Sequence, residues 1–184
     1  MNRIKKIFQN RSEKVIPYLT AGYPRKEDTV AIVLAAESAG AAMVELGMPF
    51  SDPLADGPVI QASSQTAIEN GVTIPWILET VSKIRKESEI PITLMGYINP
   101  IIKYGLSLFI IDCKLSGVDG LIIPDLPLEE ADDFVKISKG NDILPILLVA
   151  PNTTDVRIRE ISKLADGLIY CVAILGITGS QVAA

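Results

Sequence analysis

The sequence contains no histidine among its 184 residues. Catalysis by a Ser-His-Asp triad or a Cys-His pair therefore cannot be carried by this chain, and the usual histidine-containing zinc sites are excluded as well. We expect no metal centre. Cysteine is nearly absent too, since Cys113 and Cys171 are too few for a disulfide framework. We expect both to be buried, reduced thiols in a cytoplasmic protein.

Long apolar runs and positive charge are also scarce. No uninterrupted apolar stretch approaches the ~20 residues that a membrane-spanning helix needs, and the first residues lack the apolar region of a secretory signal. The formal net charge is −5, without the basic stripe typical of nucleic-acid binders. We therefore expect neither a membrane nor a nucleic acid as partner. The 48% of hydrophobic residues is the composition of a globular domain with a large core.

Short apolar runs alternate with longer helical patterns along the chain. The runs predict strands at 15–20, 42–46, 92–95, 120–123, 143–149 and 167–172. Apolar periodicity and capping signals predict helices at about 27–39, 58–70, 75–87, 107–116, 128–139 and 154–165. Strands that are apolar on both faces are typical of parallel sheets, so the pattern indicates an α/β protein built from βα units.

Two architectures fit a βα repeat: an open doubly wound sheet and a (β/α)8 barrel. The turn at 21–24 lacks the glycine-rich dinucleotide fingerprint of the open sheet. Barrel active sites lie at the carboxyl ends of the strands. Polar residues recur there: Thr20, Glu45, Tyr97, Asp125, Asn152 and Thr178. We favour the barrel and expect residues 1–184 to form one domain. Because a full barrel takes ~250 residues, six βα units leave it incomplete at the C-terminus.

The segment 45–58 carries the most information, with the sequence Glu-Leu-Gly-Met-Pro-Phe-Ser-Asp-Pro-Leu-Ala-Asp-Gly-Pro. If Glu45 points into an apolar interior, burial raises its pKa and makes it a useful proton donor and acceptor near neutral pH. The alternative is an ion pair with a Lys or Arg. Asp56 precedes a glycine in a proline-rich loop and could simply cap the next helix. Three apolar side chains indicate that this loop closes over something: Met48, Phe50 and Leu54.

Two weaker features lie near the end of the chain. The loop at 176–180 has two glycines and two hydroxyls that could present amides to a phosphate, or it could be a mobile connection. Tyr170 either packs in the core or directs its hydroxyl into the site.

The segment 45–58 resembles the signature of the tryptophan synthase alpha chain family. Further segments agree with that family in order, at 17–24, 94–100, 117–120, 124–127, 149–152 and 176–179. The resemblance covers essentially the whole chain and implies a TIM barrel. It also implies a lyase of L-tryptophan biosynthesis, which cleaves indole-3-glycerol phosphate to indole and glyceraldehyde 3-phosphate by a retro-aldol reaction.

The resemblance implies a role for several residues. Glu45 is similar to the family's general acid/base, and Asp56 to the carboxylate that binds the indole N–H. Tyr170 is similar to an active-site tyrosine, and the resemblance places Tyr18 and Tyr97 in the indole pocket. Two residues are similar to the mobile loop and part of the phosphate site: Thr178 and Gly179.

The resemblance also implies partners. It implies no cofactor for this chain, and an α2β2 assembly with a beta chain that carries pyridoxal phosphate and docks near 52–56 and 97–104. Members of the family are longer, so the chain looks like a C-terminally truncated member, and we expect little or no activity from it alone. One alternative is a non-catalytic chain that only binds and modulates a beta chain. Another phosphate-handling barrel enzyme, such as an isomerase, does not explain the segment 45–58.

Overall fold

The computed structural model describes residues 2–9 and 14–173, and its frame is a parallel sheet. Six strands follow one another across this sheet in the order of the sequence. They are β1 (Tyr18–Thr20), β2 (Val44–Gly47), β3 (Ile92–Met95), β4 (Gly120–Ile122), β5 (Leu144–Val149) and β6 (Ile169–Cys171). All five pairings are parallel. This order is that of successive βα units in a barrel wall, as the sequence predicts.

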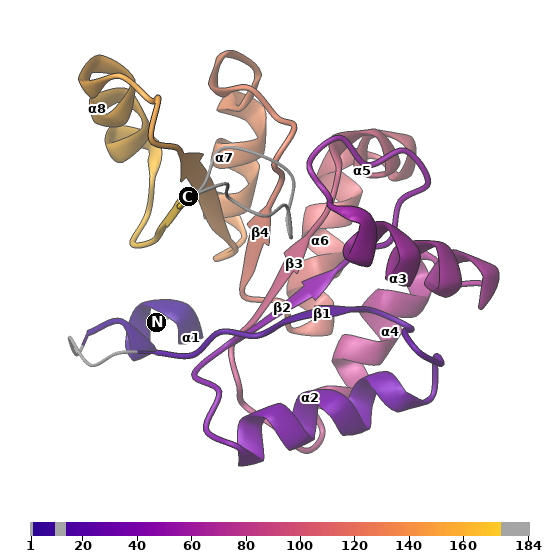
Figure 1. The fold of residues 1–184 in the computed structure, drawn as a ribbon. Coiled ribbons are helices and arrows are strands. Elements are labelled where there is room, and N and C mark those ends of the chain that lie inside the picture. Colours follow the sequence, from indigo (N-terminus) through magenta and orange to yellow (C-terminus); the bar gives the residue numbers. More distant parts are fainter. Residues whose placement is uncertain (1, 10–13, 174–184) are drawn as a thin grey trace, which may run out of the picture.

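Helices connect the strands and cover the outer face of the curved sheet (Figure 1). They are α2 (Asp28–Ser38), α3 (Pro58–Glu69), α4 (Ile74–Ile84), α5 (Ile98–Tyr104), α6 (Leu106–Ser116), α7 (Asp132–Gly140) and α8 (Asp155–Leu164). A short helix, α1 (Arg3–Ile7), lies on the other side of the sheet from α2, α4 and α6. Within the described ranges no helix is long and apolar enough to cross a membrane.

The core has an outer and an inner layer because successive strand residues point to opposite faces of the sheet. On β4, Leu121 packs in the larger cluster with the helices, whereas Ile122 packs in a smaller one on the inner face. Ile4 of α1 belongs to the inner cluster and is fully buried there. A Cβ added to Gly120 would come within 2.8 Å of the Ile4 side chain, so the glycine makes room for α1 against the sheet.

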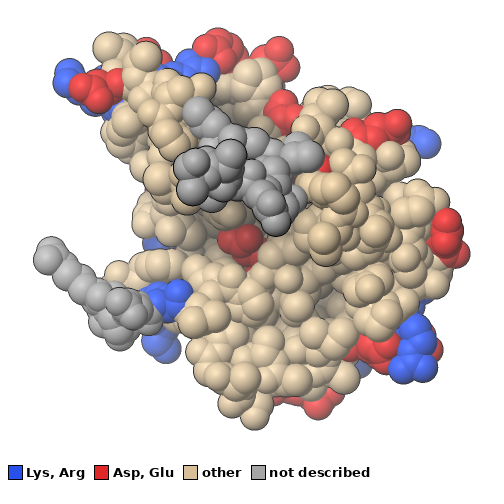
Figure 2. All heavy atoms as spheres, in the orientation of Figure 1, with Lys and Arg blue, Asp and Glu red and all other residues tan. Residues whose placement is uncertain are grey.

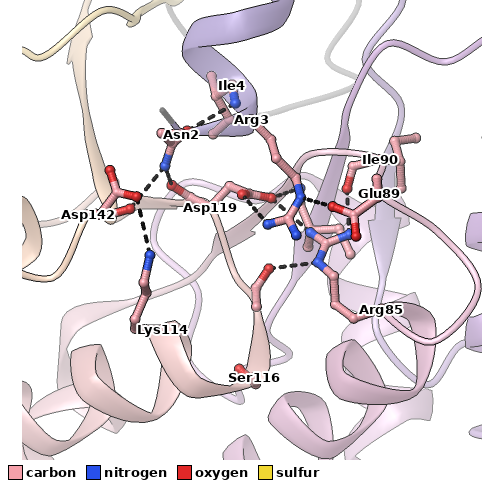
Figure 3. Close-up of polar contacts among 12 residues, drawn as sticks. Asn2, Arg3, Ile4, Arg85, Glu89, Ile90, Lys114, Ser116, Asp119 and Asp142 are labelled. Atoms are coloured by element: carbon pink, nitrogen blue, oxygen red, sulfur yellow. Dashed lines mark hydrogen bonds and ion pairs between the residues drawn. The ribbon is translucent and has the colours of Figure 1, made fainter.

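Polar contacts fix α1 to the sheet at the amino ends of β3 and β4 (Figure 3). Asp119 is almost fully buried and accepts bonds from Arg3 at 3.0 Å, Arg85 at 2.8 Å and the Ile92 amide at 2.9 Å. The side chain of Asn2 donates to the Asp119 carbonyl at 2.8 Å. A buried carboxylate held by two guanidinium groups needs these partners, because an unpaired charge in the interior is costly.

The predicted elements are present, and several details were wrong. Two helices, α1 and α5, were not predicted from the sequence. The helix predicted at 128–139 is split into a 3-10 turn, Leu128–Glu130, and α7, which includes Gly140. The helix predicted to begin at 107 begins one residue earlier, at Leu106 after Gly105. Cys113 is buried, but Cys171 is exposed because β6 lies at the edge of the described sheet.

Candidate functional site

Glu45 lies on β2, the second of the six strands, and points to the inner face of the sheet. On β2 its neighbours Val44 and Leu46 pack in the outer cluster, so the side chain between them faces inward. Glu45 is 8% exposed, and burial raises its pKa from 4.5 to about 7. None of the ion pairs found in residues 2–9 and 14–173 includes it. The structure therefore has the buried carboxyl and not the ion pair that was its alternative.

Two tyrosines, one from each edge strand of the described sheet, lie near Glu45. Tyr18 pairs in register with Glu45 on the adjacent strand. Burial and then the charge of Asp56 raise the pKa of Tyr18, with a smaller contribution from Glu45. Burial also raises the pKa of Tyr170, and Glu45 adds to the effect. Tyr18 and Tyr170 therefore both lie within electrostatic range of one carboxyl, although they come from β1 and β6.

A glycine on β2 makes room for Tyr18. A Cβ built on Gly47 would overlap the hydroxyl and ring carbons of Tyr18. Glycine at this position lets the tyrosine ring lie across the end of β2 toward the two acids. The sequence gives no signal for this role, because a glycine at a strand end is also common in ordinary turns.

Asp56 is held by Tyr97 and does not cap the following helix. The residue at the cap position of α3 is Gly57, and no side chain bonds the helix start there. The Tyr97 hydroxyl accepts the Ala55 amide at 3.0 Å and lies near enough to the Asp56 carboxyl to lower its pKa. Burial raises the pKa of Asp56, and the bond from Tyr97 opposes that shift. Burial raises the pKa of Tyr97 to about 12, so its hydroxyl stays protonated and can donate to Asp56.

The apolar residues of the loop have three different surroundings. Met48 is buried against Gly96, where an added Cβ would approach its side chain to 2.6 Å. Phe50 stacks on Tyr97 with the ring centres 5.4 Å apart. Leu54 is 80% exposed. Met48 is thus a core residue, and of these three side chains only Leu54 is mostly presented to solvent.

A mostly apolar cavity of about 300 Å³ lies between β1, α2 and α3, and neither Glu45 nor Asp56 lines it. Tyr18 and Thr20 line it from the sheet, and Ser63 lines it from α3. The hydroxyls of Thr20 and Ser63 share a hydrogen bond of 2.7 Å, which ties the end of β1 to the helix that follows the Asp56 loop. The sequence analysis missed Ser63, because nothing in a helical serine indicates which strand it will meet. In Figure 2 the face shown is hollowed near its centre, with an acidic side chain inside the hollow.

The remaining predicted site residues cannot be placed. Thr178 and Gly179 lie outside the described residues. In the part of the chain that the structure describes, no group of three or more Cys, Asp or Glu side chains could hold a metal ion. The described site is therefore two carboxyls with tyrosines near them. A buried carboxyl whose pKa lies near 7 can give and take a proton at neutral pH.

Comparisons with known proteins all point to one family. A family model described as tryptophan synthase alpha chain matches residues 4–184. The tryptophan synthase alpha chain of Petrotoga mobilis is 49% identical over 183 residues, which cover 100% of this chain and 70% of that protein. The crystal structure of tryptophan synthase subunit alpha from Legionella pneumophila superposes with a TM-score of 0.91 at 40% identity, covering 94% of this chain and 68% of that one.

A second similar structure comes from an assembly. It is a chain of the tryptophan synthase α2β2 complex from the hyperthermophile Pyrococcus furiosus, with a TM-score of 0.82 at 42% identity. The match covers 86% of this chain and 67% of that one. The family model, the sequence identities and the fold all give the same answer: this chain belongs to the tryptophan synthase alpha chain family.

Proposed function

We propose that this chain cleaves indole-3-glycerol phosphate to indole and glyceraldehyde 3-phosphate, with Glu45 as general acid/base and Asp56 as the carboxylate that binds the indole N–H. The observation that carries the proposal is the pKa of Glu45, which burial on the inner face of β2 raises to about 7. A carboxyl with this pKa can give and take a proton at neutral pH without a large cost in either direction. Cleavage of a carbon–carbon bond by a lyase of this kind needs a group that both donates and accepts a proton.

The proposed reaction needs two proton transfers at one place. Protonated Glu45 gives its proton to the ring carbon that bears the glycerol chain, which leaves positive charge at the indole nitrogen. The Glu45 carboxylate then takes the proton of the side-chain hydroxyl on the carbon attached to the ring. That oxygen forms the aldehyde C=O, and the electron pair of the breaking C–C bond returns to the ring and neutralises it.

Asp56 and the tyrosines prepare the site for the charge that develops. The Asp56 carboxylate accepts a hydrogen bond from the indole N–H. It also stabilises the positive charge on that nitrogen, because opposite charges attract strongly where water is excluded. Tyr18, Tyr97 and Tyr170 would line the pocket around the ring, as aromatic walls suit an aromatic ligand. The phosphate would be held in part by the segment of Thr178 and Gly179.

We propose further that the chain works without a cofactor of its own, in the cytoplasm, with a beta chain that carries pyridoxal phosphate. The similar chain from Pyrococcus furiosus is part of an α2β2 complex, which supports such a partner. Leu54 on the Asp56 loop and Ile102 on α5 are 80% and 62% exposed, and exposed apolar side chains next to an active site suit a partner surface.

The test compares the wild-type chain with the Glu45→Gln variant, each assayed for indole released from indole-3-glycerol phosphate with and without a beta chain. Gln keeps the shape of the side chain and cannot carry the proton, so we expect the rate to fall by about 10²–10⁴-fold. A Glu87→Gln variant, which alters an exposed carboxyl just after the end of α4, should keep the wild-type rate. Cleavage that survives in Glu45→Gln, or no cleavage by the wild-type chain in either condition, contradicts the proposal.

A further inference from the structure

Asp125 caps a helix that belongs to a different βα unit. Helix α5 has Tyr97 as its cap residue, and the Tyr97 side chain makes no capping bond. The first amide of the helix, that of Ile98, donates instead to the Asp125 carboxyl at 2.9 Å. An unpaired amide at a helix start costs free energy, and a carboxylate there also complements the helix dipole.

The backbone holds Asp125 firmly in place. It lies between Pro124 and Pro127, in a turn closed by the Leu126 amide bonding to the Ile123 carbonyl at 3.3 Å. The ends of β3 and β4 are also tied together, since the amide of Gly96 donates to Ile122 at 3.1 Å. The carboxyl is therefore presented to α5 by a rigid segment, and the place where α5 begins depends on it.

The beginning of α5 decides where Tyr97 points. Tyr97 is 4% exposed, and its ring and hydroxyl contact three residues of the loop that carries Asp56. The ring lies against Phe50, the hydroxyl accepts the Ala55 amide, and the same hydroxyl is near enough to the Asp56 carboxyl to lower its pKa. The side chain of Ser51 bonds only its neighbour Asp52, and Gln61 of α3 donates to the Asp56 carbonyl at 2.8 Å. Tyr97 and Gln61 therefore hold the loop from two sides, and Tyr97 is the contact that comes from the unit of β3 and α5.

From this chain of contacts we infer that Asp125 is a positioning residue for the cleavage: it fixes the start of α5, α5 fixes Tyr97, and Tyr97 fixes Asp56. The inference rests on the proposed function for its catalytic meaning, but its geometric part stands apart from any activity. The negative charge of Asp125 also helps to keep the Tyr97 hydroxyl protonated, after the larger effect of burial.

The first experiment uses NMR to measure the rate at which the Ala55 amide proton exchanges with solvent. This rate reports whether the bond from Ala55 to Tyr97 is kept. The amide of Met48, which bonds to Met95 at 2.7 Å where the loop leaves β2, is the reference. We expect Asp125→Ala to speed exchange at Ala55 about fivefold relative to Met48, the factor that matches a capping energy of roughly 1 kcal/mol. Asp125→Asn keeps an acceptor oxygen and should stay within about twofold of the wild type. Tyr97→Phe, which removes the acceptor of the Ala55 amide, should reproduce the effect of Asp125→Ala.

Three results would overturn the inference: unchanged exchange at Ala55 in Asp125→Ala, equal acceleration at Ala55 and Met48, or no response to Tyr97→Phe. The second experiment measures indole release by the same variants. A displaced Asp56 should lower kcat more than it raises KM in Asp125→Ala, and Asp125→Asn should restore most of kcat. A larger change in KM than in kcat would contradict the inference. If the wild-type chain releases no indole, the proposed function fails, and the amide-exchange experiment alone decides whether Asp125 positions Tyr97 and the loop.

Discussion

Replacing Glu45 by Gln should make the folded chain more stable at high pH while removing its activity. The pKa of Glu45 is about 7 in the folded chain, against 4.5 for an ordinary glutamate. Between these two values the folded chain holds a proton that the unfolded chain has lost. The contribution of Glu45 to stability is therefore complete below about pH 4.5 and is lost as the pH rises through about 7. Gln does not ionise and avoids this loss.

The size of the effect follows from the two pKa values. Each pKa unit corresponds to about 1.36 kcal/mol, so at high pH the ionisation of Glu45 lowers the free energy of unfolding by roughly 3 kcal/mol. Linkage places about 2 kcal/mol of this between pH 5.5 and pH 8.5. The range starts at 5.5 to stay clear of the sequence pI of about 4.8, where the chain carries little net charge and tends to precipitate.

Urea unfolding followed by the fluorescence of Trp76, the one tryptophan of the chain, measures the free energy of unfolding at each pH. The difference between Glu45→Gln and wild type should grow by about 2 kcal/mol from pH 5.5 to pH 8.5. The exposed change Glu87→Gln is the control and should show a difference that stays within ~0.5 kcal/mol at every pH. A constant difference between Glu45→Gln and wild type would refute the reasoning, because it would mean that Glu45 is already ionised in the folded chain at pH 5.5.

Two further changes test the frame that holds the site. Asp119→Ala removes the shared partner of two arginines and should destabilise the chain by about 3–5 kcal/mol in urea unfolding, whereas Glu89→Gln, whose side chain is 79% exposed, should cost less than ~1 kcal/mol. Equal costs would show that burial does not decide the strength of these pairs. Gly47→Ala places a methyl group on the Tyr18 hydroxyl and should cost about 1–3 kcal/mol and most of the activity, while Gly140→Ala, with nothing within 4 Å of the new carbon, should be neutral or slightly stabilising. Full activity in Gly47→Ala would show that Tyr18 need not lie where the structure has it.

The sequence predicted the order and type of the six strands because each is a mostly apolar run between clear turn residues. It missed α1 because a five-residue helix has no periodic pattern, and its buried Ile4 is explained only by the space above Gly120. It missed α5 because Pro100 looks like a helix breaker, although proline is tolerated in a first turn whose amides have no partner within the helix. These two helices depend on contacts between distant parts of the chain.

The same limit applies to the site. The direction of Glu45 stayed open in the sequence, because a strand that is apolar on both faces does not show to which face the residue between Val44 and Leu46 points. The role of Asp56 could not be decided from its neighbours, since Asp before Gly is also a common turn pair. Its partner, Tyr97, comes from another βα unit, and so does the carboxyl of Asp125 that caps the helix after Tyr97.

The account depends most directly on the ionisation of Glu45. Carbon-13 NMR of the glutamate side-chain carboxyls, titrated from pH 5.5 to pH 8.5, can follow it, and the signal is assigned by its absence from the spectrum of Glu45→Gln. The account predicts that this carboxyl titrates with a pKa of about 7 in the folded chain. A signal that shows Glu45 ionised throughout that range would contradict the account, because a carboxyl already ionised at pH 5.5 has no proton to donate to an indole ring at neutral pH.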